Sequence, residues 1–580
     1  MPRLKSVCPS VNRCKTARLF LAIFVSVSLT CLFSCSTITV EKLYENGVVA
    51  TSSPIASEIG LNVLKDGGNA FDAAVAVGFA LAVSFPEAGN IGGGGFAVLY
   101  DANTDDVTAL DFRETAPAQA TADMYLNQHG KVIKNASLLG AQAAGVPGTV
   151  AGFYELWRRH GSKPWLELVK PAIDLADSGF IIDEHNAGMF EEYEKELRTF
   201  AETRAVYTID GTTLKEGDRF VQPDLAATLT RIGRDSTDGF YSGETADKIV
   251  QTMQRHDGLI THNDLTGYKP VWRQPIMFTF DDTLTIYSMP PPSSGGVIVG
   301  QILKLLEPFE FVTYTCDSPE YIHLFAEVCR LAYADRSVYL GDPEFVDNRV
   351  EQLLDSTYLD SRRKLIDPKN AASFEKVKAG VIGGQVESES TTHYCIVDSE
   401  GNAVSITYTL NTAFGSKLVV DGAGFLLNNE MDDFSIKPGV ANAYGLIGDK
   451  ANEIAPNKRM LSSMSPTIVF NREKPVMVLG SPGGSKIITT VAEAIINISR
   501  FGLNINQAVK QPRFHFQWLP DTLYLEMHGF DINVIQSLIT MGHNIKEREP
   551  YSDLQIIYID DSDQISGASD PRRGGKAVGY

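Results

Sequence analysis

Two threonines, Thr391 and Thr409, occupy matching positions in a predicted β-hairpin. The segments Thr392–Val397 and Ala403–Leu410 are rich in β-branched and aromatic residues, and Asp398–Asn402 between them has the composition of a turn. With the turn centred on its middle residue, Thr391 lies opposite Thr409 on the same face of the hairpin. One hydroxyl can then donate a hydrogen bond to the other and orient it for nucleophilic attack.

The chain that leads into Thr391 favours self-cleavage. Residues 380–390 are rich in Gly, Ser and Glu without periodicity, which predicts an exposed loop. If the Thr391 hydroxyl attacks the Ser390 carbonyl, the acyl group shifts from nitrogen to oxygen, and water resolves the ester. The freed α-amine of Thr391 titrates near 7.7–8.0 and can serve as the base for its own hydroxyl. Spacing alone leaves open that both threonines are ordinary strand residues.

Acyl transfer also requires donors for the developing oxyanion. Gly483 and Gly484 lie between a predicted strand and a predicted helix, in the segment Ser481–Ser485. Successive glycines can direct two backbone N–H groups at one point. From the sequence, a simple strand-to-helix turn remains an equal alternative.

Helices and strands alternate along the chain that must position these residues. Apolar periodicity predicts helices over Pro54–Asp66, Ala70–Phe85, Gly152–His160, Trp165–Ser178, Pro319–Tyr339, Ile487–Ser499 and Ile532–Met541. Strands are predicted over Phe96–Tyr100, Val107–Phe112 and Ile276–Met289, and Thr392–Phe470 is predicted to be strand-rich. Helices on both sides of strands are compatible with a layered sandwich of the α+β class.

Bulk properties exclude several classes of function. The length of 580 residues favours two or more domains. A formal charge of −20 argues against a nucleic-acid partner, which requires clustered Lys and Arg. The sequence holds neither an HExxH motif nor a Cys/His cluster, so we expect no catalytic metal and no cofactor.

The N-terminus has the pattern of an export signal. Basic residues precede the apolar run Leu19–Phe33, which is short for a membrane span of about 20 residues. Residues 32–35 resemble a bacterial lipobox with Cys35 as the lipidated residue, although Phe33 replaces the usual small residue. We expect residues 1–34 to be a signal peptide and the protein to reach the bacterial periplasm. Lipid anchoring through Cys35, a soluble cleaved form and an uncleaved anchor remain open.

Blocks of sequence throughout the chain resemble the γ-glutamyltranspeptidases (glutathione hydrolases), which belong to the N-terminal-nucleophile hydrolases. The resemblance begins near residue 45 and is carried by Gly47–Gly60, Ile91–Asp101, Asp111–Pro117, Met289–Gly296, Thr391–Ser416, Leu426–Ser435, Lys437–Gly445, Pro456–Val469, Gly480–Ile487 and Ser569–Tyr580. It implies a four-layer αββα sandwich. It also implies a precursor that matures into a large subunit, residues 35–390, and a small subunit, residues 391–580, which form a heterodimer.

The resemblance also assigns roles to individual residues. Thr391 is the implied nucleophile, Thr409 its orienting partner, and Gly483 and Gly484 the oxyanion hole. The implied donor pocket comprises Arg113, Ser462 and Ser463 for the α-carboxylate, Asn411, Glu430 and Asp433 for the α-ammonium, and Tyr444 in a lid. An Arg guanidinium can bind a carboxylate with two parallel hydrogen bonds. Many bacterial members carry Gln where this chain has Glu430.

The implied activity is that of a γ-glutamyltransferase and glutathione hydrolase. Thr391 would take the γ-glutamyl group from glutathione or a related compound and pass it to water or to an amino-acid or dipeptide acceptor. One alternative is a cephalosporin or glutaryl acylase, or a relative that cleaves poly-γ-glutamate. Another is an unprocessed envelope protein that only binds γ-glutamyl peptides.

Overall fold

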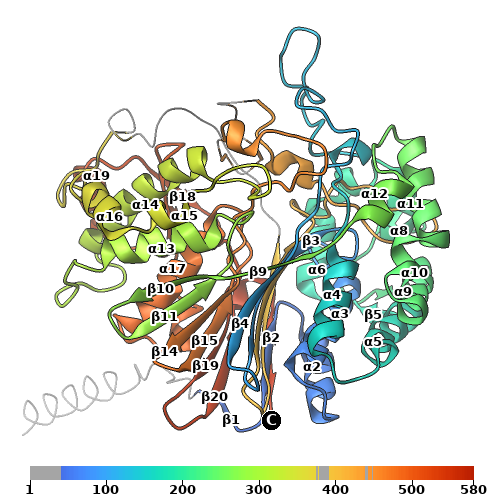
Figure 1. Cartoon of the computed structure of the whole chain (residues 1–580), viewed down its shortest axis with the longest axis horizontal. Coiled ribbons are helices and arrows are strands. Elements are labelled where there is room, and N and C mark those ends of the chain that lie inside the picture. Colours follow the sequence, from blue (N-terminus) through green and yellow to red (C-terminus); the bar gives the residue numbers. More distant parts are fainter. Residues whose placement is uncertain are drawn as a thin grey trace, which may run out of the picture. The chain divides into compact units, whose positions relative to one another are not determined.

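Two seven-stranded sheets lie face to face, and helices cover the outer face of each (Figure 1). The computed structural model describes residues 41–373, 377, 391–437, 440, 442–443, 445–446 and 448–580, and the elements below belong to the unit Leu43–Tyr580. The layers confirm the predicted αββα sandwich of the α+β class.

All strand pairs within both large sheets are antiparallel. The first sheet has the order β1 (Leu43–Tyr44), β20 (Ile565–Ser569), β19 (Gln555–Ile559), β15 (Lys474–Gly480), β14 (Thr467–Asn471), β11 (Leu284–Ser288) and β10 (Ile276–Phe280). The second has the order β21 (Lys576–Gly579), β2 (Val48–Thr51), β12 (Thr392–Val397), β13 (Ala403–Thr409), β3 (Gly94–Asp101), β4 (Asp106–Phe112) and β9 (Val271–Arg273). Neighbouring strands therefore often come from distant parts of the sequence.

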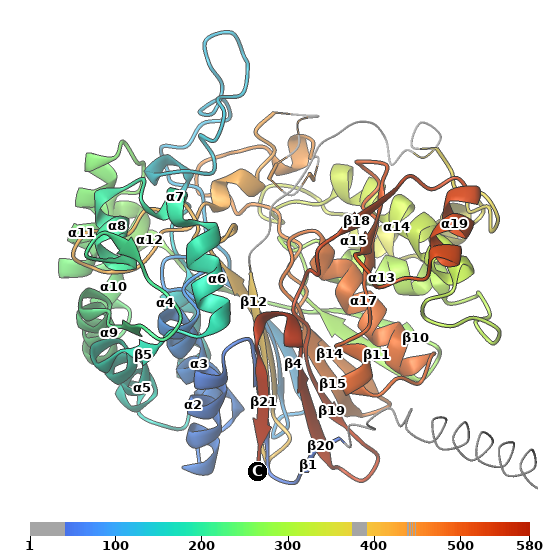
Figure 2. The same cartoon turned by 180° about the vertical axis from the view of Figure 1, so that it is seen from behind.

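Two groups of helices form the outer layers (Figure 2). The second sheet is covered by α2 (Pro54–Lys65), α3 (Ala70–Ser84) and α4 (Thr149–His160), with α5 (Trp165–Ser178) packed on α3. The first sheet is covered by α13 (Gly295–Leu306) and α17 (Lys486–Ser499), and α14 (Pro319–Tyr339) packs against α13. Helix α3 is buried along its whole length, as its continuous apolar sequence predicts.

The apolar core divides according to strand periodicity. In β12, Ile396 packs toward the helices α2–α4, whereas Cys395 and Val397 pack toward the other sheet. Because successive side chains point to opposite faces, a strand between two layers is buried on both of its faces. The strands β12 and β13 meet this condition, since every residue of both is buried.

Most predicted elements are confirmed to within a few residues at their ends, and two predictions are wrong. The segment 276–289 is a hairpin rather than one strand, because Asp281 and Asp282 adopt positive φ angles and reverse the chain between β10 and β11. The described residues of 410–466 carry isolated bridges and short 3-10 turns rather than strands. Positive φ angles at Asn411 and Phe414 are incompatible with continued β-structure.

Candidate active site

The pairing of β12 with β13 places Thr391 beside Thr409. Thr392 pairs with Tyr408, and the same register brings the preceding threonine opposite Thr409. The Thr391 hydroxyl donates to the Thr409 hydroxyl at 3.3 Å, and both residues are 3% exposed. The predicted cross-strand pairing of the two hydroxyl residues is therefore confirmed.

Thr391 begins a column of polar side chains between the two sheets. One step along the hairpin, His393 Nδ1 lies 2.8 Å from Thr407 Oγ1, and His393 Nε2 lies 3.0 Å from Cys395 Sγ. Burial lowers the pKa of His393 to about 3, so its ring is neutral. The ring fits because Gly480 has no side chain: a Cβ there would lie 2.3 Å from it. The packing of His393 thus supports the strand that presents the nucleophile.

A narrow pocket lies next to the Thr391 hydroxyl. Its lining residues are Arg113, Thr391, Thr409, Asn411, Glu430, Asp433, Leu446, Ser462, Ser463, Met464, Gly484 and Ile487. The fold thus gathers the end of β4, the start of β12, the end of β13, the turn after β15 and the loop residues before β14. Nine of the residues predicted from the sequence to form the catalytic and donor sites are in this set.

Arg113 is the electrostatic centre of the pocket. Its guanidinium is buried, with Nη1 2.6 Å from Glu430 Oε2 and Nη2 2.5 Å from Asp433 Oδ2. Burial favours a neutral arginine, but these carboxylates and Glu114 outweigh it and raise the pKa of Arg113. Burial also raises the pKa values of Glu430 and Asp433, against the opposing effect of Arg113. Arg113, predicted to bind the donor carboxylate, is thus paired here with Glu430 and Asp433, which were predicted to bind the donor ammonium.

The remaining donor-site residues are held by local hydrogen bonds. Ser463 Oγ accepts from Arg336 Nη2 at 3.1 Å, and burial lowers the pKa of Arg336 to about 10. Asn411 Nδ2 donates to the Asn429 carbonyl at 3.0 Å, while its backbone N–H donates to Thr409 Oγ1 at 2.8 Å. Arg336 thus adds a second cation behind the serines, which the sequence analysis did not identify.

The Gly483–Gly484 turn leads into α17. Their φ angles are +132° and +56°, and L-residues with side chains rarely adopt them. Gly484 lines the Thr391 pocket, whereas Gly483 does not appear among the lining residues. A Cβ at Gly483 would lie 2.5 Å from Ser552 Oγ. Close packing and backbone geometry both require glycine at Gly483.

A second group of residues missed by the sequence analysis fixes the backbone of Thr391. Arg573 Nη1 donates to the Thr391 carbonyl at 3.0 Å and to Glu87 Oε1 at 3.3 Å. His185 Nε2 lies 3.2 Å from the other oxygen of Glu87. Burial alone raises the pKa of Glu87, but His185 and Arg573 outweigh it, so the net shift is downward and the carboxylate is ionised. The C-terminal block containing Arg573 was noticed in the sequence, but nothing in its spacing indicated this contact.

Four further predictions fall outside the described residues. These are the signal segment 1–34, the lipidation residue Cys35, the lid residue Tyr444, and the predicted exposed loop 380–390, whose last residue Ser390 precedes the predicted cleavage.

Known proteins similar to this chain agree with the geometry. The family model described as Gamma-glutamyltranspeptidase matches residues 56–580. The glutathione hydrolase proenzyme of Escherichia coli (strain K12) is 46% identical over 529 residues, which cover 91% of this chain and 90% of the relative. The crystal structure of cephalosporin acylase from Bacillus halodurans has a TM-score of 0.83 at 26% identity, covering 94% of this chain and 98% of that one. The structure of Helicobacter pylori gamma-glutamyltranspeptidase has a TM-score of 0.56 at 43% identity, covering 57% of this chain and 94% of that one.

Proposed function

Because the chain belongs to the γ-glutamyltranspeptidase family, we propose that it is a glutathione hydrolase and γ-glutamyltransferase whose nucleophile is Thr391. The observation that carries this proposal is the contact between the Thr391 and Thr409 hydroxyls in a pocket that also holds Arg113 and Asp433. A nucleophile and the charged groups that a γ-glutamyl donor requires thus meet in one place.

The proposed reaction has two acyl-transfer steps. The α-amine of a processed Thr391 takes the proton of its own hydroxyl, and the oxygen attacks the γ-amide carbonyl. Backbone N–H groups of Gly483 and Gly484 would stabilise the oxyanion. The resulting α-ammonium protonates the leaving amine, which is cysteinylglycine when glutathione is the donor. Water or an acceptor amine then attacks the γ-glutamyl ester, passes its proton to the same amine, and regenerates the hydroxyl.

The charges in the pocket support a zwitterionic donor. The α-carboxylate of a γ-glutamyl group would bind Arg113 together with Ser462 and Ser463, while Glu430, Asp433 and Asn411 would accept from its α-ammonium. The donor carries one charge of each sign, so it exchanges partners with the existing ion pairs without adding net charge to a buried site. A desolvated pocket penalises unpaired charge strongly.

A glutaryl acylase is the rival suggested by the cephalosporin acylase structure. A glutaryl group has a carboxylate but no ammonium, so it would leave the carboxylates of Glu430 and Asp433 without a cationic donor group. Rates with γ-glutamyl-p-nitroanilide and glutaryl-p-nitroanilide distinguish the two activities. We expect the γ-glutamyl compound to be preferred, and preference for the glutaryl compound would reject the assignment.

Maturation is proposed to occur by cleavage between Ser390 and Thr391, which divides the chain into residues 35–390 and 391–580. Thr391→Ala should leave one uncut, inactive chain on denaturing electrophoresis, whereas Thr391→Ser should still process because it retains a hydroxyl. Active enzyme in which mass spectrometry finds residues 390 and 391 still joined would contradict the proposal. Folded wild-type protein that stays uncut and shows no activity would instead favour the binding-protein alternative.

Export is proposed from the N-terminal sequence. The basic segment, the apolar run and Cys35 support cleavage after residue 34 and a periplasmic location, with lipid attachment at Cys35. Among the described residues, no helix combines the length and apolar character needed to cross a bilayer. Cys35→Ala should move the protein from the membrane fraction to the soluble fraction. Unchanged fractionation would reject the lipid anchor.

A further inference from the structure

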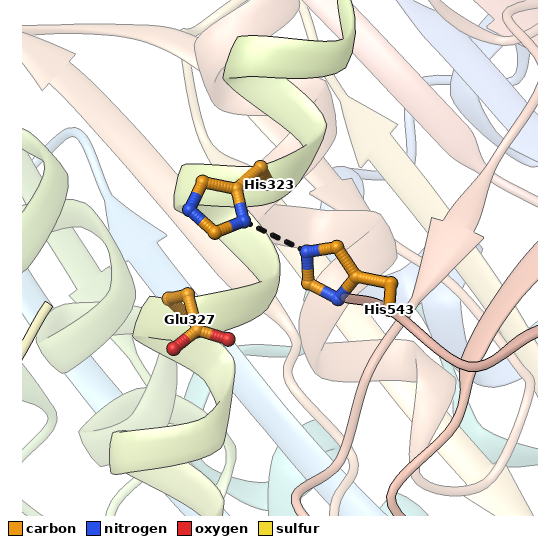
Figure 3. Close-up of side chains that lie close together, drawn as sticks. All are labelled: His323, Glu327 and His543. Atoms are coloured by element: carbon orange, nitrogen blue, oxygen red, sulfur yellow. Dashed lines mark hydrogen bonds between the residues drawn. The ribbon is translucent and has the colours of Figure 1, made fainter. Parts of the chain in front are cut away.

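Three buried side chains with metal-ligand chemistry meet outside the Thr391 pocket: His323, Glu327 and His543 (Figure 3). His323 and Glu327 are four residues apart on α14 and therefore share one helix face. His543 lies in the turn between α19 (Ile532–Thr540) and β18 (Ile545–Arg548). One potential ligand atom from each residue lies within 4.8 Å of the other two.

We propose that His323, Glu327 and His543 form a structural site for a divalent transition-metal ion of the zinc class. Two imidazoles and one carboxylate are an established ligand set for Zn²⁺ and leave a fourth position for water. The site would join a helix that precedes residue 390 to a turn that follows it. The site is separate from the proposed chemistry, because none of its three residues lines the Thr391 pocket.

The hydrogen bonds of His323 leave the correct nitrogen available. Its Nε2 lies 2.8 Å from the carbonyl of Asp367, which can only accept, so Nε2 carries a proton. Nδ1 is then an unprotonated lone pair directed at His543. Metal-binding histidines commonly donate their other ring N–H to a backbone carbonyl in this way.

The pair of imidazoles has nearly the spacing that a shared metal requires. His323 Nδ1 and His543 Nε2 are 2.8 Å apart, and the ring centres are 5.0 Å apart. Zn–N bonds of about 2.0–2.1 Å at a tetrahedral angle place two nitrogens roughly 3.3 Å apart and the ring centres roughly 5 Å apart. The two nitrogens now point almost directly at each other, so each ring would have to turn by roughly 35° to direct its lone pair at a shared tetrahedral metal.

His543 must move its ring proton to bind a metal. Because His323 Nδ1 accepts, the 2.8 Å contact places the proton on His543 Nε2, which a metal would have to displace. Within the described residues His543 Nδ1 has no hydrogen-bond partner, although the side chain is buried. That nitrogen can therefore hold the ring proton when a metal occupies Nε2.

Charge and spare lone pairs at Glu327 complete the site. Glu327 Oε1 accepts from Arg330 Nε at 3.1 Å and Oε2 accepts from the Ala372 N–H at 3.0 Å, which leaves further lone pairs on both oxygens. Arg330 is also paired with Asp521 at 2.6 Å. Glu327, Arg330 and Asp521 together carry one net negative charge, which favours a dication.

Metal content and thermal stability test the proposal in the intact protein. After treatment with a chelator and dialysis against Zn²⁺, elemental analysis should find about one zinc per chain, and the Tm should rise by about 1–3 °C relative to the chelated form. Co²⁺ in place of Zn²⁺ should produce visible absorption bands typical of tetrahedral coordination. His323→Gln and His543→Gln should lose the zinc and the Tm shift. His129→Gln, which removes an exposed histidine, should retain both.

Wild-type protein that binds less than about a tenth of an equivalent of zinc, with no change in Tm, would overturn the proposal and leave a hydrogen-bonded histidine pair. Zinc retained by both cluster variants would overturn it as well. If a variant fails to fold, the wild-type measurements still decide, because they need no substitution.

Discussion

Glu114 shows how strongly a single buried carboxyl depends on its neighbours. It is fully buried, and within the described part of the chain neither of its oxygens has a hydrogen-bond partner. Burial raises the pKa of Glu114 to about 8, although Arg113 Nη1, 3.7 Å away, acts in the opposite direction. The Glu114 carboxyl, which lies beside the donor pocket, therefore stays protonated at neutral pH.

Because Glu114 keeps its proton in the folded protein, the free energy of unfolding depends on pH. Between about pH 5 and pH 8 the unfolded chain has lost the proton while the folded chain keeps it, so the contribution of Glu114 falls as the pH rises. This contribution to stability is complete below about pH 4.5 and lost as the pH passes 8.

In Glu114→Gln this loss should disappear, so the Tm of the variant should rise relative to wild type from pH 5 to 8.5. Calorimetry measures this difference, with exposed Glu216→Gln as a control that should follow wild type. A constant difference across the range would contradict the assignment.

The hairpin β12–β13 holds its register through side chains stacked between the sheets. Gly480→Ala should disturb that stack, because the new Cβ would lie 2.3 Å from the His393 ring and have to displace it. Overpacking of this kind costs about 1–3 kcal/mol, and the shift should also slow processing at Thr391. A time course of denaturing electrophoresis and a Tm measurement check both effects. Gly267→Ala is the matched control, since nothing lies within 4 Å of a Cβ there.

Local pattern predicted the hairpin well and the long-range contacts poorly. Alternating β-branched residues around one turn determined the register, so the Thr391–Thr409 pairing followed from the sequence. The donor pocket was expected only through the family resemblance, because Arg113 and Asp433 are 320 residues apart. Arg573 and the histidine pair could not be predicted, since neither belongs to a periodic pattern. The strand-rich prediction fails for the described residues of 410–466, because their buried valines and leucines resemble strand residues while their turns depend on positive φ angles.

At the scale of the whole molecule, the segments before and after residue 390 are interleaved. In the second sheet, β12 and β13 lie between β2 and β3. In the first sheet, β14 pairs with β11. The proposed cleavage before Thr391 would break one covalent bond but none of the strand pairings among the described residues. Separation of the two fragments would expose both cores to water, which is strongly unfavourable.

We therefore predict that the processed fragments behave as one folded body. Size-exclusion chromatography should show them eluting together at the mass of the uncut chain, and heating should unfold them in one cooperative transition. Two native species, or two separate unfolding transitions, would contradict the interleaved arrangement. Uncut Thr391→Ala protein provides the reference for both measurements.

The last residue of the chain lies beside the first strands: the Tyr580 carbonyl accepts hydrogen bonds from the N–H groups of Glu45 and Asn46, at 3.3 and 2.9 Å. This adjacency makes the fold suitable for circular permutation. A short linker from Tyr580 to Leu43 would allow translation to start at residue 391. Removal of the initiator methionine would then expose the threonine amine without internal scission, and maturation could be studied apart from turnover.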